Sequence, residues 1–264
     1  MLNDLDLIVK QYPEDFETLR VYAIGDIHVG APEFDEQAIK KKIKIIQDDP
    51  NGVVSLCGDL GNFGLASSVT NCYLEKLSPA EQQEYICRLL EPIKEKVIAC
   101  VPGNHEERLV RESGINPLYT ICCKLGIENV YRDALAITKL SFGYITGRQM
   151  CFVIITTHGA TRAKHRRFTS AIDNIDAGIS GHSHTPEYSP RGRLRVNSKA
   201  STVSWVPYKE LVVDAHLKPG GYSLKKEYEI APPPELQYLE LSIYRDNTRQ
   251  RRRHKVINYH AIQI

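Results

Sequence analysis

The chain has 264 residues, of which 42% are hydrophobic and 25% are charged, and its formal net charge is +2. That composition suits a domain with a substantial core, and no apolar run approaches the roughly 20 residues that a membrane span needs. The seven cysteines include no Cys-x-x-Cys pair, which argues against a zinc ribbon or a disulfide framework and predicts free thiols in a reducing cytoplasm. Residues 1–6 lack the basic and apolar regions of a signal peptide.

Charge is unevenly distributed along the chain. Residues 1–157 carry 16 Lys and Arg against 22 Asp and Glu, a balance of −6, whereas residues 158–264 carry 18 against 10, a balance of +8. The basic half is suited to an anionic substrate, although an unevenly charged, solvated surface explains the same numbers.

The first elements alternate between apolar runs and amphipathic stretches. Residues 1–17 have apolar residues spaced for one helical face and predict a lead-in helix that breaks at Pro13. Residues 21–25 predict a buried strand, residues 35–47 an amphipathic helix whose lysines mostly face water, and residues 53–57 a second buried strand. This order predicts a parallel pair with a right-handed crossover, and ligands gather at the carboxyl ends of such strands.

A strong helix start follows at Ser78. Pro79 occupies the first turn and Glu81 is placed for a capping box, so a helix should run to Lys96 with a kink or a break at Pro92. The other elements expected before residue 187 are strands over 97–101, 135–140, 151–157 and 177–180 and a helix over 116–124.

The remainder, residues 187–264, contains no convincing helix. Its alternating runs predict antiparallel strands over 194–197, 210–214, 239–244 and 255–264, separated by Pro- and Gly-rich turns. We expect this strand-rich part to complete a second sheet within a single domain that spans residues 1–264, with residues 1–20 as its lead-in.

Five polar segments each follow an apolar strand. They are, in order, Asp26-x-His28, Gly58-Asp59, Gly103-Asn104-His105-Glu106, His158-Gly159 and Gly181-His182-x-His184. A single buried histidine is usually just hydrogen-bonded, but the ordered set is specific, and over residues 20–186 it resembles the calcineurin-like metallophosphoesterase superfamily. The resemblance implies an α/β (α+β) fold, a four-layer sandwich of two mixed β-sheets flanked by helices, and two-metal-dependent hydrolysis of phosphoesters.

Two divalent cations about 3.5 to 4 Å apart can clamp a phosphate and stabilise its entering and leaving oxygens. Such a site needs a bridging carboxylate, for which Asp59 is the natural candidate. By resemblance, the first ion would bind Asp26, His28, Asp59 and His184, and the second would bind Asp59, Asn104, His158 and His182. Nitrogen and oxygen ligands without a thiolate favour Mn, Fe, Ni, Co or Zn over Mg or Ca, and we expect Mn.

By the same resemblance, His105 would protonate or hydrogen-bond the leaving oxygen. In the family's Ser/Thr protein phosphatases, a Gly-Asp-x-x-Asp-Arg-Gly segment supplies a carboxylate that orients this histidine and an arginine that grips phosphate. Asn62 and Phe63 stand at those positions here, and Pro102 replaces the arginine before the Gly-Asn-His-Glu motif. These differences argue against a protein phosphatase, and the Gly-His-x-His segment looks more like the phosphodiesterase and nuclease branches. The orientation of His105 stays open: Asn62 could orient it by a hydrogen bond that adds no charge, a carboxylate such as Glu106 could do so, or the leaving group needs less help.

Two basic segments bear on the substrate. Arg162, Arg166 and Arg167 closely follow His158, so a loop there would overhang the metals, whereas the arginine-rich residues 249–255 are explained at least as well by a solvated turn. The leading hypothesis is a two-metal-dependent phosphodiesterase or nuclease acting on nucleic acid or a nucleotide-like diester. A phosphomonoesterase for a small phosphorylated metabolite or nucleotide is the first alternative. The second is a non-catalytic scaffold, which the complete set of ligands disfavours; the oligomeric state stays open.

Overall fold

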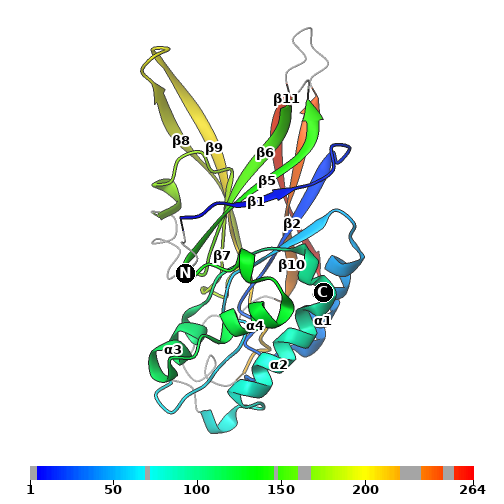
Figure 1. The fold of residues 1–264 in the computed structure, drawn as a ribbon, viewed down its shortest axis with the longest axis vertical. Coiled ribbons are helices and arrows are strands. Elements are labelled where there is room, and N and C mark those ends of the chain that lie inside the picture. The colour runs from blue at the N-terminus through cyan, green and yellow to red at the C-terminus, as the bar shows by residue number, and fades with distance from the viewer. Residues whose placement is uncertain (1–4, 69–71, 146–147, 160–167, 221–232, 246–252) are drawn as a thin grey trace.

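The computed structural model describes residues 5–68, 72–145, 148–159, 168–220, 233–245 and 253–264 (Figure 1). They form two mixed β-sheets that pack face to face with helices flanking them, so the expected fold class is confirmed. The strands are β1 (Ile8–Gln11), β2 (Thr18–Ile24), β3 (Gly52–Leu56), β4 (Val97–Cys100), β5 (Leu135–Ile145), β6 (Arg148–Thr157), β7 (Ala177–Ser180), β8 (Glu187–Asn197), β9 (Thr202–Val212), β10 (Glu235–Arg245) and β11 (Arg253–Gln263). The helices are α1 (Glu36–Asp48), α2 (Pro79–Leu90), α3 (Asn104–Ser113) and α4 (Pro117–Leu125), with short 3₁₀ helices η1 (Cys72–Leu74), η2 (Glu91–Lys96) and η3 (Glu128–Val130).

Sheet B has the strand order β11-β10-β2-β3-β4. Strands β2, β3 and β4 run parallel, whereas β10 is antiparallel to β2 and β11 is antiparallel to β10. Helix α1 connects β2 to β3, and α2 with η2 lies in the connection from β3 to β4. The three parallel strands therefore end at one edge of the sheet.

Sheet A has the strand order β1-β5-β6-β7-β9-β8. Its central strands β6, β7 and β9 run parallel. Strand β5 is antiparallel to β6, and β8 is antiparallel to β9. Strand β1 pairs in parallel with β5 at the edge. The parallel strands of both sheets thus offer carboxyl ends at which polar residues can gather.

Two clusters of apolar side chains cover the two faces of sheet B. Between the sheets, Val21 belongs to the same cluster as Phe142 and Phe152, whose stacked rings have centroids 5.4 Å apart. On the other face of sheet B, Ile39 of α1 and Ile86 of α2 pack in the second cluster. Burial on both faces explains why β2, β3 and β4 are continuous apolar runs.

Helix boundaries follow their capping residues. The Ser78 side chain accepts a hydrogen bond from the N–H of Glu81, and the Glu81 carboxylate accepts one from the N–H of Ser78, so the predicted capping box is present. The α-helix ends at Leu90 and continues as η2 around Pro92, because proline lacks the N–H that an α-helix uses there. Asn116 caps α4 as its sequence indicates.

The expected N-terminal helix is wrong. Residues 8–11 form β1 and pair in parallel with residues 138–141 of β5. Ile8 is buried whereas Val9 is 52% exposed, so the apolar side chains alternate with the period of a strand. Helix α3 was not predicted in the sequence analysis. Only two of its ten residues, Glu106 and Leu109, are buried, so the helix lacks the apolar face that would indicate it.

Residues 187–264 contribute to both sheets, and not to the second sheet alone as expected. Strands β8 and β9 belong to sheet A, while β10 and β11 belong to sheet B. Alternating hydrophobicity indicates a strand but does not specify its neighbour, which is why the sequence analysis did not predict that β10 and β11 join sheet B. No helix occurs in the described residues of this part, as predicted.

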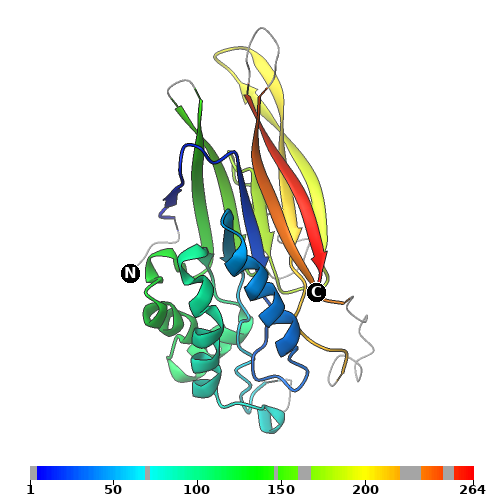
Figure 2. The same ribbon diagram turned by 90° about the vertical axis from the view of Figure 1, so that its right-hand side faces the viewer.

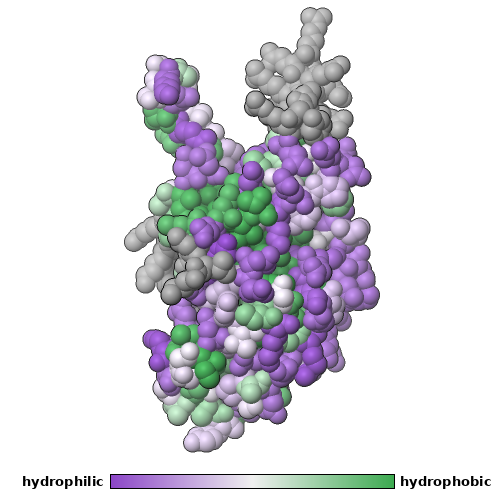
Figure 3. All heavy atoms as spheres, in the orientation of Figure 1, coloured by the Kyte–Doolittle hydropathy of each residue, from purple (hydrophilic) through white to green (hydrophobic). Residues whose placement is uncertain are grey.

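The two outer faces of the sandwich differ. Helices α1 and α2 cover sheet B, and the three hairpins β5–β6, β8–β9 and β10–β11 rise beyond the helices at the opposite end of the molecule (Figure 2). On the outer face of sheet A, Ile172 and Ile175 pack near Ile137 and Val153, and apolar surface remains visible over β5 and β6 (Figure 3). In the described part of the chain, every helix is too short or too polar to cross a bilayer.

Candidate metal centre

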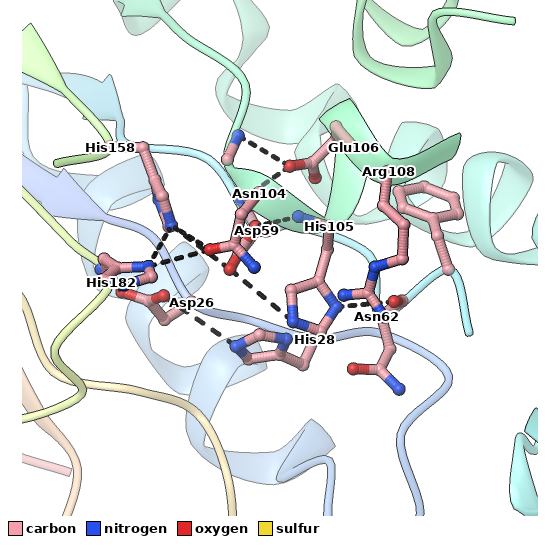
Figure 4. A network of polar contacts seen from close by, with 12 residues as sticks. Asp26, His28, Asp59, Asn62, Asn104, His105, Glu106, Arg108, His158 and His182 are labelled. Carbon is pink, nitrogen blue, oxygen red and sulfur yellow. Dashed lines mark hydrogen bonds and ion pairs between the residues drawn. The ribbon is translucent and has the colours of Figure 1, made fainter. Parts of the chain in front are cut away.

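Five strand ends bring the predicted site residues together (Figure 4). They are Asp26 and His28 after β2, Asp59 after β3, Asn104 and His105 after β4, His158 after β6, and His182 and His184 after β7. Most of these side chains are buried or half-buried. The site therefore lies where the parallel strands of the two sheets end, the usual place for a ligand in open α/β sheets.

The backbone of these turns is strained. Positive φ angles occur at Asp26 (48°), His28 (53°), Asp59 (51°), His182 (70°) and His184 (55°). A non-glycine residue pays of the order of 1 to 3 kcal/mol for such a conformation, and such residues cluster at functional sites. Packing of the surrounding sheets must therefore hold these side chains in place.

Two glycines allow the turns to approach one another. A Cβ on Gly103 would lie 2.1 Å from Oδ1 of Asp59, and a Cβ on Gly181 would lie 2.5 Å from Oδ2 of Asp26. No larger residue fits at either position without moving a carboxylate. Lack of space for a side chain thus explains why the Gly-Asn-His-Glu and Gly-His-x-His segments each begin with glycine.

The first donor cluster consists of Asp26, His28 and His184, whose candidate ligand atoms lie within 4.8 Å of one another. Nε2 of His184 is 3.4 Å from Oδ1 of Asp26 and 3.0 Å from Nε2 of His28. Three nitrogen and oxygen donors therefore converge on one point.

The second donor cluster consists of Asp59, His158 and His182, again within 4.8 Å. Nε2 of His158 is 3.3 Å from Oδ2 of Asp59. Oδ1 of Asn104 adjoins this cluster, 3.0 Å from Nε2 of His158 and 2.8 Å from Nδ1 of His182.

Asp59 lies near the first cluster as well. Its carboxylate forms a third group within 4.8 Å with His28 and His105, so it faces one donor of the first cluster and two of the second. This position suits a carboxylate shared between two ions.

The donors fit divalent cations. Oδ1 of Asp26 is buried and has no hydrogen-bond partner among the described residues, and an unpaired buried carboxylate oxygen is costly. A cation would satisfy this oxygen. Imidazole, carboxylate and amide donors suit Mn, Fe, Co, Ni or Zn.

Strong electrostatic coupling links Asp59 to its neighbours. Burial alone raises the pKa of Asp59, but the imidazoles of His158, His105 and His28 outweigh it and hold that pKa far below the ordinary value. Burial lowers the pKa of His158, but Asp59 and Asp26 reverse this and raise it to about 10. Burial and neighbouring histidines keep the pKa of His28 well below its usual range. A proton on His158 thus balances the carboxylates in the absence of cations.

His105 is oriented by the backbone. Its Nδ1 donates to the carbonyl oxygen of Asn62 at 2.6 Å, and its N–H donates to Oδ1 of Asp59 at 2.8 Å. Nε2 then faces the site, 3.9 Å from Oδ2 of Asp59. Asn62 thus hydrogen-bonds His105 as the sequence suggested, but through its backbone carbonyl, because its side-chain amide donates to Glu75 instead. The Glu106 carboxylate does not orient His105, since it accepts from backbone N–H groups.

Glu106 holds two loops of the site together. Its buried carboxylate accepts hydrogen bonds of 2.8 Å from the N–H groups of Asp59, Leu60 and Gly103. Burial, together with the nearby charge of Asp59, raises its pKa to about 7. Glu106 therefore fixes the turn that carries Asp59.

Two residues after β9 were missed in the sequence analysis, and one of them, His216, supports the first cluster. The N–H of His216 donates to the carbonyl of Asp26 at 2.9 Å, and Nδ1 of His216 donates to the carbonyl of Gly25 at 3.1 Å. Asp214 accepts from buried Lys42 at 2.9 Å, so this lysine does not face water as most of its neighbours do. The signal was present, because an apolar strand ending in Asp-x-His repeats the pattern of Asp26 and His28.

The predicted substrate arginines Arg162, Arg166 and Arg167 lie outside the described residues, as do Arg251 and Arg252.

Comparisons with solved structures give distant similarity. The calcineurin-like phosphoesterase YfkN from Bacillus subtilis has 12% identity and a TM-score of 0.45, covering 93% of this chain and 90% of that chain. Vps29 from Chaetomium thermophilum has 9% identity and a TM-score of 0.38, and the match covers 93% of this chain and 97% of that chain. Scores this low carry no argument about function. No curated protein matches the chain.

The sequence model of the calcineurin-like phosphoesterases matches residues 19–186. This segment covers more than half of the chain and contains every residue of both donor clusters. The chain belongs to the calcineurin-like phosphoesterase family.

Proposed function

We propose that this family member is a phosphodiesterase or nuclease that uses two divalent ions, with manganese preferred, and acts on nucleic acid or a nucleotide-like diester. The observation that carries the proposal is the pair of donor clusters, each of three residues within 4.8 Å, with Asp59 near both. When bound, two such ions supply Lewis-acid stabilisation of a phosphate. Asp26, His28 and His184 would hold one ion, Asn104, His158 and His182 the other, and Asp59 both.

The proposed role of His105 is general acid at Nε2. Its Nδ1 hydrogen is committed to the Asn62 carbonyl, so a proton on Nε2 is the one available to the leaving oxygen. Burial lowers the pKa of His105 while Asp59 opposes this effect. General-acid catalysis by a positioned side chain typically raises the reaction rate by about 10²- to 10⁴-fold.

Two positions that lack an arginine favour a diester over a monoester. Buried Phe63 and buried Pro102 occupy the positions where the family's protein phosphatases have phosphate-binding arginines. A diester group carries one negative charge and a monoester group carries up to two, so the diester needs fewer cations.

The seven free cysteines support a reducing compartment, for which we propose the cytoplasm.

The test is to assay the manganese-loaded protein on bis-p-nitrophenyl phosphate beside p-nitrophenyl phosphate. We expect faster hydrolysis of the diester and loss of both activities after chelation. Faster hydrolysis of the monoester would favour a phosphomonoesterase. No hydrolysis of either compound by metal-loaded protein would contradict the proposal and favour a scaffold.

The nucleic-acid part of the proposal has its own test. Replacing Arg162, Arg166 and Arg167 with alanine should weaken oligonucleotide turnover and lower the salt dependence of binding by about one unit of slope per lost phosphate contact. Alanine at Arg251, Arg252 and Arg253 removes the same charge and is the matched control. If neither variant alters oligonucleotide turnover, a small-molecule substrate becomes the better explanation.

A further inference from the structure

Arg108 shares a helical face with the proposed acid. It lies three residues after His105 and four after Asn104 on α3, and side chains at these spacings are neighbours on a helix surface. In Figure 4, Arg108 lies beside His105 on the side away from His158 and His182. One helix thus presents a donor residue, the proposed acid and a cation in sequence.

The guanidinium of Arg108 has no carboxylate partner among the described residues. Its one described hydrogen bond runs from Nη1 to Oγ of Ser68 at 2.5 Å. By contrast, Arg20 and Arg195 each form an ion pair with an aspartate. Burial lowers the pKa of Arg108 although Asp59 opposes the shift. A half-buried guanidinium with five N–H donors and one described acceptor can bind an anion.

The orientation of His105 indicates which anion. Nε2 of His105 faces Asp59, and Nδ1 is bound to the Asn62 carbonyl, so a leaving oxygen protonated at Nε2 lies between the donor clusters and His105. The rest of the leaving group must extend away from the clusters. Arg108 lies on that side of His105 (Figure 4).

We infer that Arg108 forms a subsite for a second phosphate, one carried by the leaving group. This inference rests on the proposed function and specifies its substrate class: a nucleotide or polynucleotide in which the leaving nucleoside bears another phosphate. Ser68 holds the Arg108 guanidinium in position. The remaining N–H groups of the guanidinium bind phosphate oxygens by charge-assisted hydrogen bonds.

Two thymidine dinucleotides test the subsite. One has a single internal phosphate, and the other carries additional phosphates at both ends, so its leaving nucleoside is phosphorylated whichever bond to the internal phosphate breaks. We expect wild-type protein to prefer the second. Arg108→Ala should lower kcat/KM for that substrate by about 10- to 100-fold, the size expected for charged hydrogen bonds, and lower it by a smaller factor for the first.

Arg111→Ala is the matched control, because Arg111 is exposed on the same helix and its loss changes the net charge equally. It should alter neither substrate. Arg108→Lys keeps the charge without the planar fork and should fall between wild type and Arg108→Ala. Unchanged urea midpoints would show that all variants fold.

Two results would overturn the subsite: an equal fall in kcat/KM for both dinucleotides in Arg108→Ala, or no preference of the wild-type protein between them. If bis-p-nitrophenyl phosphate is still hydrolysed, the proposed function stands in either case. If that diester is not hydrolysed, the proposed function fails, and calorimetry of the doubly end-phosphorylated dinucleotide with metal-loaded protein still decides the subsite. Equal affinity of wild type and Arg108→Ala would then contradict it.

Discussion

The protein holds the two donor clusters in different ways. In the second cluster, Nδ1 of His158 donates to the Cys57 carbonyl at 2.7 Å, and Asn104 contacts both imidazoles. In the first cluster, Oδ1 of Asp26 has no hydrogen-bond partner among the described residues, and the His184 side chain is 37% exposed. The second cluster is therefore arranged by its hydrogen bonds, whereas the first needs an ion to complete its contacts. We expect the second cluster to bind its ion more tightly.

The largest effect should come from Asp59, which adjoins both clusters. Asp59→Asn should reduce turnover of bis-p-nitrophenyl phosphate to background and lower the metal content, because an amide cannot balance two cations. Unfolding in urea should stay cooperative, since the change is local. Wild-type activity with two bound ions would show that Asp59 does not bridge.

His105→Ala should slow turnover without altering either cluster. We expect a loss of about 10²- to 10⁴-fold for esters with basic leaving groups and a smaller loss for p-nitrophenyl esters, because only a poor leaving group needs a proton. Metal content should match wild type. If the loss is the same for p-nitrophenyl and alkyl esters, His105 binds phosphate and is not the acid.

The supports of the two clusters can be removed separately. Glu106→Gln places N–H donors against the backbone N–H groups of the Asp59 turn. Because Asp59 is proposed to hold both ions, this variant should weaken both by about 10- to 100-fold, as outer contacts of metal ligands typically do. Exposed Glu107→Gln is its control. His216→Gln should instead weaken only the first ion. Calorimetric titration with Mn²⁺ resolves the two sites, and a loss at the second site in His216→Gln would contradict this division.

Much of this arrangement was predictable from local sequence. Buried strands that end in Asp, Asn or His stand out, and strand polarity alone places those residues at one edge. The supports were harder to predict because they depend on distant contacts. Lys42 meets Asp214 across 172 residues of sequence, and His216 reaches the carbonyl of Gly25 across 191. The Asn62 carbonyl is a backbone group, so no side-chain pattern could reveal that it orients His105.

The smallest effect concerns protons. The pKa of His158 is raised to about 10 without cations, so below that pH its imidazole is protonated, and an ion that binds neutral imidazole must displace the proton. Metal binding at pH 8 should release about one proton from the second cluster, and metal affinity should rise with pH up to about 10. Calorimetry in two buffers of different ionisation enthalpy measures this release. Identical heats in both buffers would contradict a protonated His158.

Titration of metal-free protein with Mn²⁺, followed by both bound metal and hydrolysis of bis-p-nitrophenyl phosphate, tests the two-ion site most directly. We predict two ions per chain, a tighter one in the second cluster, and hydrolysis that appears only as the weaker ion binds. His184→Ala should abolish the weaker binding event and retain the tighter one. Full activity with a single bound ion, or no activity with two, would contradict the account.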